Sequence, residues 1–250
     1  GFGGAFVPIY KDHPAVGNIG IFDTDTGRME EFARTHGIQR QYHSFDEILR
    51  DKEVDAVHLV TPIPLHAEQT VAVLDSGKHC ACTVPMATSL EDLERITAAV
   101  RRSGKKYMMM ETTLYTRQFF YARQMLENGE FGKIQFLRGS HYQDMANWPS
   151  YWMGLPPMWY GTHAIAPMRV MAGTRIQKVH CFGSGTMEEW LARQYQNPYP
   201  VETAIFSFEN GLKGEATRTL CETARVYQEG MLFTAVKRAL NGALQTMMIR

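Results

Sequence analysis

The sequence lacks several features that define other classes of protein. It has no excess of either charge, because 26 Lys and Arg residues balance 26 Asp and Glu residues in a chain of 250. No basic block is present that would bind nucleic acid or an acidic membrane. No apolar run approaches the roughly 20 residues that cross a bilayer, and no basic-then-apolar signal peptide opens the chain. We therefore expect a cytoplasmic protein that binds neither nucleic acid nor membranes.

Cysteine is also scarce, with four residues: Cys80, Cys82, Cys181 and Cys221. The close pair has C-x-C spacing and lies in an apolar run, whereas structural zinc sites use paired C-x-x-C motifs. We predict reduced, buried thiols and no metal site.

The first part of the chain alternates short β-like runs with helical patterns, which is typical of βαβ units and a parallel sheet. Glycines follow three of the helical patterns, where a left-handed C-cap is expected. Residues 1–112 are therefore predicted to form an α/β domain of the Rossmann type, a doubly wound parallel sheet. Its predicted strands are Asn18–Asp23, Ala56–Val60, His79–Thr83 and Lys106–Met110, and its helices Thr26–His36, Leu65–Ser76 and Ser89–Arg102.

The pattern changes after about residue 112, where longer strand-like runs follow one another without intervening helices. This favours an α+β domain with a largely antiparallel sheet over residues 113–250. The spacing of Leu, Met and Ala in Gly230–Arg250 favours a final helix. The other predicted elements are helices Thr116–Asn128 and His163–Met171, and strands Lys133–Tyr142, Gln177–Ser184, Thr203–Phe208 and Lys213–Thr219.

The glycines that open the chain suit a phosphate-binding turn. Gly1, Gly3 and Gly4 would let backbone N–H groups approach a pyrophosphate, although such a cluster is also common in ordinary turns. About twenty residues on, Asp23 ends a predicted strand, where a carboxylate binds ribose hydroxyls and repels a 2′-phosphate. NAD is thus favoured over NADP. Asp23-Thr24-Asp25 also suits a helix N-cap, and both roles are compatible.

A series of motifs resembles one oxidoreductase family, the glucose–fructose oxidoreductase, inositol dehydrogenase and rhizopine-catabolism (Gfo/Idh/MocA) family. The motifs are Val54-Asp55-Ala56-Val57, Thr61-Pro62, His66, Ser76-Gly77-Lys78-His79, Gly129-Glu130-Phe131-Gly132-Lys133-Ile134 and Gly161-Thr162-His163. By this resemblance the first strand and an earlier glycine are missing, and we expect the sequence to be truncated at both ends. The cofactor-binding residues that it implies are Gly1, Phe2, Gly3, Asp23, Thr61, Pro62, His66, Thr83 and Pro85.

The family resemblance implies hydride transfer between nicotinamide and a secondary alcohol of a sugar or polyol. Typical members carry Glu-Lys-Pro, whose Lys polarises the reacting oxygen, where this chain has Thr83-Val84-Pro85. Trp159 and Ala166 stand where two acids are expected, and Val84 can neither donate a hydrogen bond nor carry charge. Of the catalytic pattern only His163 remains, as a general base or as a helix N-terminal residue bonded to a neighbour.

Other side chains are candidates to replace the lysine. We take His163, Tyr160 and His141 as catalytic candidates; strand alternation predicts that either His141 or Tyr142 points to the working face of the sheet. Aromatic rings in the loop from Asn147 to Tyr160 suit the C–H faces of a sugar, or ordinary packing, or a subunit contact. The predicted substrate-binding residues are Tyr115, Arg117, Trp152 and Trp159.

Three functional hypotheses follow from these patterns. The first is an NAD-dependent dehydrogenase or reductase that acts on a sugar or polyol. The second is an NAD-dependent glycosidase that oxidises its sugar transiently and cleaves by elimination, which the same broad family includes. The third is a non-catalytic regulatory protein that binds the dinucleotide or a sugar, supported by the loss of the lysine and both acids. The resemblance also implies a homo-oligomer formed through the sheet of the second domain.

Overall fold

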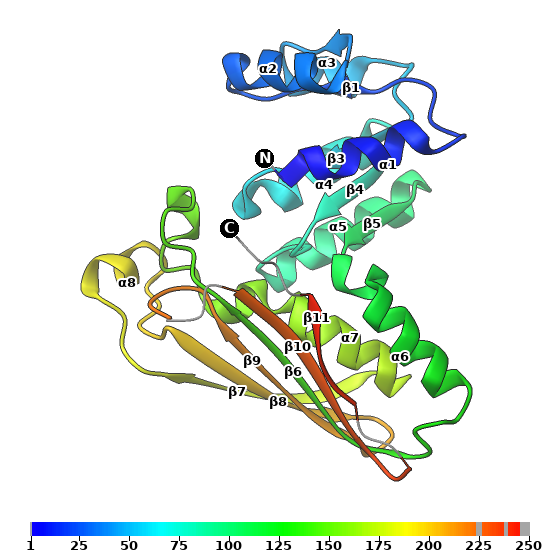
Figure 1. The fold of residues 1–250 in the computed structure, drawn as a ribbon. Helices are drawn as coiled ribbons and strands as arrows, with labels where there is room; N and C mark the ends of the chain where they lie inside the picture. The colour runs from blue at the N-terminus through cyan, green and yellow to red at the C-terminus, as the bar shows by residue number, and fades with distance from the viewer. Residues whose placement is uncertain (1, 224–226, 238–239, 246–250) are drawn as a thin grey trace. The chain divides into compact units, whose positions relative to one another are not determined.

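The computed structural model describes residues 2–223, 227–237 and 240–245, the last of these by their backbone (Figure 1). The chain divides into two compact units, Gly1–Met110 and Glu111–Arg250. In the described part of the chain, no helix combines the length and the apolar character needed to span a membrane.

The first unit has the predicted alternation of strands and helices, with all strand pairs parallel. Three strands pair in the order β3-β4-β5, and β1 pairs with β2 in a separate small sheet. Helices α1 and α3, strand β2 and the short 3₁₀ helices were not predicted. The elements are Phe2–Phe6 (η1), Val7–Asp12 (α1), Gly20–Ile21 (β1), Thr26–His36 (α2), Arg40–Gln41 (β2), Phe45–Arg50 (α3), Ala56–Leu59 (β3), Ile63–Leu65 (η2), His66–Asp75 (α4), His79–Thr83 (β4), Leu90–Ser103 (α5) and Tyr107–Met110 (β5).

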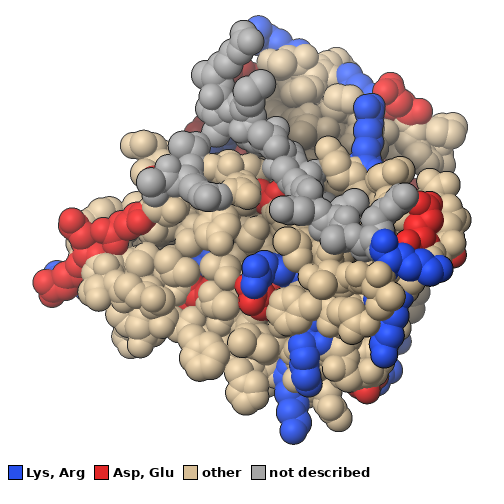
Figure 2. Space-filling model, turned by 60° about the horizontal axis from the view of Figure 1, so that its bottom comes forward, with Lys and Arg blue, Asp and Glu red and all other residues tan. Residues whose placement is uncertain are grey.

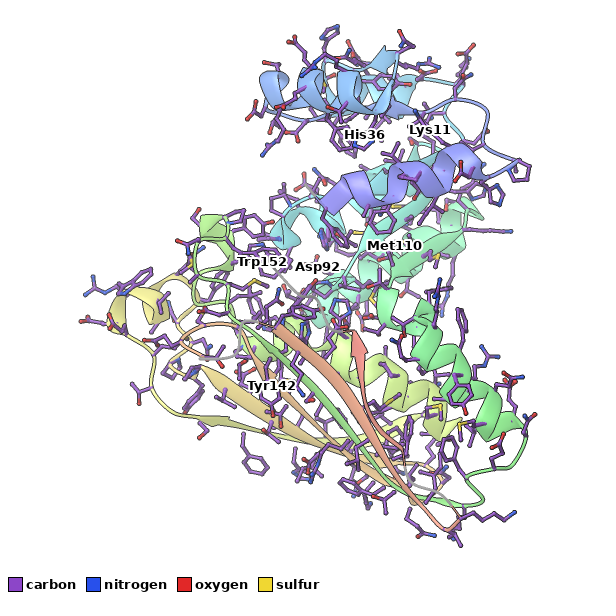
Figure 3. The ribbon with its side chains drawn as sticks, in the orientation of Figure 1. Lys11, His36, Asp92, Met110, Tyr142 and Trp152 are labelled. Atoms are coloured by element: carbon purple, nitrogen blue, oxygen red, sulfur yellow. The ribbon has the colours of Figure 1, made fainter. Side chains whose placement is uncertain are left out.

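The ends of the helices in this unit are set by local side chains. The Ser89 hydroxyl accepts a hydrogen bond from the N–H of Asp92 at 3.1 Å and so caps α5, as N-cap residues do. The predicted cap of α2 is also present, since Asp25 accepts from the N–H of Arg28 at 3.0 Å. The last turn of α2 is tied to α1, because the ammonium of Lys11 donates to the carbonyl of His36 (Figure 3).

The core of the first unit lies between its three-stranded sheet and its helices. Val73, Leu74 and Ala99 have no exposed surface there and pack with the two thiols of β4. All four cysteines are free; three of them are buried, as predicted, whereas the prediction is wrong for Cys181, which is exposed. Burial raises the pKa of Cys82 to about 12, so this thiol stays protonated at neutral pH.

The second unit is built on one six-stranded sheet in the order β11-β10-β6-β9-β8-β7. Among the described strand pairs of this sheet, only β6–β9 is parallel, so the largely antiparallel sheet was predicted correctly. Helices α6 and α7 lie on one face of it (Figure 1). The elements are Thr112–Tyr115 (η3), Arg117–Glu127 (α6), Ile134–Gln143 (β6), Ser150–Trp152 (η4), Pro157–Tyr160 (η5), Thr162–Ala172 (α7), Ile176–Ser184 (β7), Glu189–Tyr195 (α8), Val201–Phe208 (β8), Lys213–Thr219 (β9), Tyr227–Ala235 (β10) and Leu240–Gln245 (β11).

One glycine lets α7 approach the sheet closely. A Cβ atom on Gly139, in the middle of β6, would lie 2.1 Å from the carbonyl oxygen of Ala164. Any side chain at this position would therefore push the first turn of α7 away from the strand. The closely packed core around this contact includes Phe119, Leu137 and Met168, each at most 1% exposed.

The helix predicted over Gly230–Arg250 is wrong. Residues 227–235 and 240–245 form strands β10 and β11, which pair antiparallel with each other, while β10 also pairs with β6. Along β10 the side chains of Glu229, Met231 and Phe233 are buried, a period of two that the Leu, Met and Ala spacing obscured. Residues 246–250 of that prediction lie outside the described residues.

Candidate active site

A cluster of buried polar side chains lies in the second unit, between the helix α7 and the sheet. Two histidines form its centre: His163 in the first turn of α7 and His141 near the end of β6, with ring centroids 5.2 Å apart. The close approach at Gly139 brings these two elements together. Tyr160 stands beside both rings, at 5.2 Å from the centroid of His163 and 6.2 Å from that of His141. The structure thus places the three predicted catalytic residues next to one another.

Glu111 fixes the orientation of the His163 ring. One of its carboxylate oxygens, Oε1, lies 2.5 Å from His163 Nδ1 and also accepts hydrogen bonds from the N–H and the hydroxyl of Thr113. Burial by itself would raise the pKa of Glu111, but its interaction with His163 and the hydrogen bonds from Thr113 outweigh burial and hold that pKa below its ordinary value. The carboxylate is therefore ionised and accepts a hydrogen bond from Nδ1–H. Nε2 is left with the lone pair of a base.

The Nε2 atom of His163 faces the phenol group of Tyr160. His163 Nε2 lies 3.3 Å from the hydroxyl of Tyr160, which donates to it in this tautomer. The Tyr160 ring packs edge-on against Trp152 at 4.9 Å and lies under the guanidinium of Arg218 at 5.3 Å. Burial raises the pKa of Tyr160, and the positive charge of Arg218 partly offsets this. Glu111, His163 and Tyr160 form a continuous chain of hydrogen bonds, which we call the proton relay.

Arg218 on β9 holds the frame of the cluster in place. It has no exposed surface, and burial lowers its pKa to about 9. Its guanidinium donates to the backbone carbonyls of Tyr160 at 3.0 Å and His141 at 3.1 Å. It also donates to the carbonyl of Thr219 and to the side-chain oxygen of Gln143. Arg218 is thus committed to the protein's own oxygens.

A second acid lies on the other side of His141. Glu229 Oε1 is 3.6 Å from His141 Nε2, just beyond hydrogen-bonding distance, and accepts from the hydroxyl of Tyr227 at 2.5 Å. Burial raises the pKa of Glu229, with a smaller contribution from the charge of Glu111. Burial and the charge of Arg218 hold the pKa of His141 well below its ordinary value, so this ring is neutral.

The structure brings only some of the predicted substrate-binding residues to the cluster. Trp152 does reach it, through its packing on Tyr160. Trp159 packs on the ring of Tyr195 and is 38% exposed, while Tyr115 is 60% exposed and packs on Phe120. Arg117 is exposed at the start of α6.

Of the neighbouring residues on β6, it is His141 that faces α7. Tyr142 therefore points to the opposite face of the sheet. Figure 3 labels Tyr142 on the strand and Trp152 in the loop that follows it.

Sequence reasoning missed five residues of the cluster, although signals for some of them existed. Glu111 directly follows the apolar strand β5, at the edge where parallel sheets carry functional groups. A charge at a buried position of a strand, as at residues 218 and 229, is rare unless it is functional or paired. The missed residues are Glu111, Gln143, Arg218, Tyr227 and Glu229.

The first unit holds the residues predicted to bind a dinucleotide. His66 is 1% exposed and lies with Nδ1 2.7 Å from the carbonyl oxygen of Pro85 and Nε2 2.9 Å from that of Thr61. It therefore lies between carbonyls of the loops that follow β3 and β4; Pro62 is in the first of these loops, and Thr83 is the last residue of β4. Dinucleotides bind at the carboxyl edge of such sheets, and the fixed loops fit that role. Val84, in the position of the family's lysine, is 6% exposed.

The other predicted cofactor residues lie near the start of the chain. Gly1 lies outside the described residues, Phe2 is exposed, and a Cβ on Gly3 would meet nothing closer than Val60 at 3.9 Å. The carboxylate of Asp23 accepts two hydrogen bonds from Arg28, at 2.9 and 3.1 Å. Among the described residues, no three His, Cys, Asp or Glu side chains are placed to bind a metal ion.

A parallel nucleotide-binding sheet followed by a mixed-sheet domain defines the class of NAD-binding, Rossmann-fold oxidoreductases. Residues 1–111 match the model of the oxidoreductase family with an NAD-binding Rossmann fold, and residues 119–229 match the Gfo/Idh/MocA C-terminal domain. The chain belongs to the Gfo/Idh/MocA family.

The curated relatives of the chain include a dehydrogenase and glycosyl hydrolases. The chain is 24% identical over 228 residues to 1-carboxy-3-chloro-3,4-dihydroxycyclohexa-1,5-diene dehydrogenase of Comamonas testosteroni, covering 87% of this chain and 56% of that protein. It is 22% identical over 246 residues to a glycosyl hydrolase family 109 protein of Saccharopolyspora erythraea, covering 88% and 53%. The chain thus spans about half the length of these curated relatives.

Solved structures share the fold. One is scyllo-inositol dehydrogenase from Lactobacillus casei with bound NAD(H) and scyllo-inositol, with a TM-score of 0.77 at 16% identity, covering 95% of this chain and 71% of that one. At this identity the likeness shows the fold alone.

Proposed function

We propose that the protein is an NAD-dependent dehydrogenase or reductase that transfers a hydride between nicotinamide and a secondary alcohol or ketone of a sugar or polyol. The observation that carries the proposal is the buried proton relay, because oxidation of an alcohol requires a base for the hydroxyl proton. A nicotinamide cofactor, when bound, supplies the hydride chemistry.

The relay performs the proton transfer that the missing lysine assists in typical members. His163 Nε2 accepts the proton of the substrate hydroxyl, directly or through the Tyr160 hydroxyl, and returns it in the reverse direction. Glu111 stabilises the imidazolium that forms and, in the neutral ring, holds the tautomer in which Nε2 carries the lone pair. His141 lies beside this pair as a neutral polar group. Val84, being apolar and buried, takes no part.

The cofactor is proposed to be NAD, held by residues of the first unit. The loops that contain Thr61, Pro62, Thr83 and Pro85 provide its surface. The carboxylate of Asp23 accepts hydrogen bonds from the ribose hydroxyls, and its negative charge repels a 2′-phosphate. Arg28 forms an ion pair with Asp23, and an arginine near this position binds the 2′-phosphate in proteins that use NADP. The affinities for NADH and NADPH therefore decide between the two cofactors.

A second candidate function is an NAD-dependent glycosidase that oxidises its sugar only transiently. It is favoured by the similarity to glycosyl hydrolase family 109 proteins. A relay that accepts and returns a proton suits both reactions. They differ in the product: the glycosidase releases a sugar and leaves NAD unchanged.

We also propose that copies of the chain associate through the sheet of the second unit. Strand β7 lies at the edge of this sheet, and Val179 and Phe182 on it are 53% and 61% exposed. Figure 2 turns the bottom of Figure 1 toward the viewer and shows mainly uncharged residues with scattered basic and acidic side chains. Light scattering of the purified protein tests for a dimer or larger species. The free cysteines suit the reducing cytoplasm, where we expect the protein to act.

The test of the function has two stages. Titration with NADH and with NADPH, followed by nicotinamide fluorescence, measures cofactor binding and preference. A panel of sugars, cyclitols and nitrophenyl glycosides with NAD then separates net reduction of NAD from release of nitrophenol. We expect NADH formation that the His163→Gln variant abolishes. Cofactor binding without either reaction would favour the regulatory hypothesis, and no cofactor binding would refute the proposal.

A further inference from the structure

The polar atoms that lack partners are concentrated in the candidate active site. Among the described residues, seven buried side-chain nitrogen or oxygen atoms have no hydrogen-bond partner. Four of them belong to the cluster: Glu111 Oε2, Glu229 Oε2 and both ring nitrogens of His141. These three residues are at most 2% exposed. Buried polar groups are nearly always paired, so such a concentration points to a ligand.

The unpaired atoms restrict the charge of that ligand. Glu111 is ionised, so its free oxygen only accepts hydrogen bonds, and its charge repels an anion. Arg218 is a cation in the cluster, but the carbonyls of Tyr160, His141 and Thr219 and the amide oxygen of Gln143 occupy four of its five N–H groups. Among the described residues, a carboxylate or phosphate would therefore meet the charge of Glu111 and a guanidinium with a single N–H left.

The same atoms also disfavour a cation. Neutral His141 presents one N–H donor and one lone pair, so it needs a partner that both accepts and donates. An ammonium group only donates, and it would lie near the buried positive charge of Arg218. A hydroxyl group donates to the carboxylates, and it both donates to and accepts from His141. It pairs with Glu229 whether that acid is ionised or protonated.

We propose that Glu111, His141 and Glu229 form a subsite that binds hydroxyl groups of an uncharged polyol and discriminates against carboxylated, phosphorylated and aminated sugars. The proposal rests on the proposed function, since the same residues surround the relay, and it narrows the substrate to a neutral polyhydroxyl compound. It assigns Glu229, which takes no part in the proton transfer, a role in choosing the substrate.

Calorimetric titration measures the discrimination directly. The ligands are myo-inositol, glucose and galactose, and their charged counterparts glucuronate, galacturonate, glucose 6-phosphate and glucosamine, each added to the protein with saturating NADH. We expect at least one neutral compound to bind, and each of its charged counterparts to bind at least ten times more weakly. Binding of none of the neutral compounds, or equal or tighter binding of a charged one, would overturn the proposal.

Two variants connect the discrimination to the named residues. Glu229→Gln removes a carboxylate at constant size and should raise the affinity for uronates relative to the neutral sugar at least tenfold. His141→Phe keeps a ring but removes both nitrogens and should weaken the neutral ligand about tenfold. The matched control is Glu215→Gln, which lies on the same sheet and pairs with Arg138, away from the cluster. An unchanged ratio in Glu229→Gln, with the fold intact by circular dichroism, would refute the assignment.

The binding and turnover readouts separate the two proposals. Selective binding of a neutral polyol without NADH formation leaves the subsite intact and refutes the dehydrogenase. Turnover of a uronate as efficient as that of the neutral sugar supports the dehydrogenase and refutes the subsite.

Discussion

Replacing Glu111 by Gln tests the proton relay, because it removes one charge while keeping the size of the side chain. The hydrogen bond between Glu111 Oε1 and His163 Nδ1 is 2.5 Å long and both side chains are at most 9% exposed. Hydrogen bonds to charged groups contribute about 1.5–3 kcal/mol, more than neutral ones. If that stabilisation is realised when the imidazolium forms, kcat should fall roughly 10- to 100-fold, since about 1.4 kcal/mol is a factor of ten.

The assay is NADH formation with a neutral polyol that the wild-type protein oxidises, measured across the pH range. Glu111 acts on the proton transfer through His163, so its loss should lower kcat, and because its other oxygen belongs to the proposed subsite, KM should rise as well. The acidic limb of the pH–rate profile should move to lower pH, because a neighbouring negative charge favours protonation of the base. A purely structural role would leave the position of this limb unchanged.

The control is Glu127→Gln, which removes an exposed acid paired with Arg123 at the end of α6. It should leave both the rate and the profile unchanged. A Glu111→Gln protein that folds normally and retains full activity with the original profile would refute the relay.

The pH dependence of stability gives a second readout for Glu111. Its pKa in the folded protein lies below the ordinary carboxyl value, so its ionised form stabilises the fold above that ordinary value. This contribution is lost as the pH falls through the lowered pKa. The difference in urea stability between wild type and Glu111→Gln should therefore be largest near neutral pH and shrink in acid.

Four further predictions concern the fold. Gly139→Ala should lower the free energy of unfolding by about 1–3 kcal/mol, because its Cβ would lie 2.1 Å from the Ala164 carbonyl oxygen and overpack the contact. Activity should fall as well. Thermal denaturation measures the first effect and kcat the second. Phe131→Ala empties a site with no exposed surface and should cost about 3–5 kcal/mol in urea unfolding. Ser89→Ala removes the cap of α5 and should cost about 1 kcal/mol in the same assay. A thiol reagent should modify Cys181 rapidly in the native protein and the other three cysteines only on unfolding, as mass spectrometry of the labelled peptides would show.

The elements predicted best from the sequence are those whose signals are local. Helix α2 over Thr26–His36 and strand β9 over Lys213–Thr219 have the predicted bounds. In α2 the capping residue and the terminal glycine agree with the apolar spacing. The end of the chain was mispredicted because β10 depends on pairing with β6, which lies almost a hundred residues earlier. Local spacing carries no information about such a partner.

The candidate site could be predicted only in part for a similar reason. His163, Tyr160 and His141 were found through a family motif and the alternation of one strand. Glu111 and Glu229 were missed because they come to the cluster from distant parts of the sequence. Their importance lies in what they contact, and a lone acid after a strand does not reveal its partner.

The lost lysine explains why the missed residues matter. A lysine carries a positive charge, whereas the valine at position 84 is apolar and buried. In the second unit, Arg218 cannot substitute, because its hydrogen bonds hold the protein's own carbonyls. What remains near His163 is a carboxylate on one side and a phenol on the other. Such an arrangement favours a strong base over an electrophile, and so favours removal of a proton from a hydroxyl group that the free oxygens of Glu111 and Glu229 help to hold.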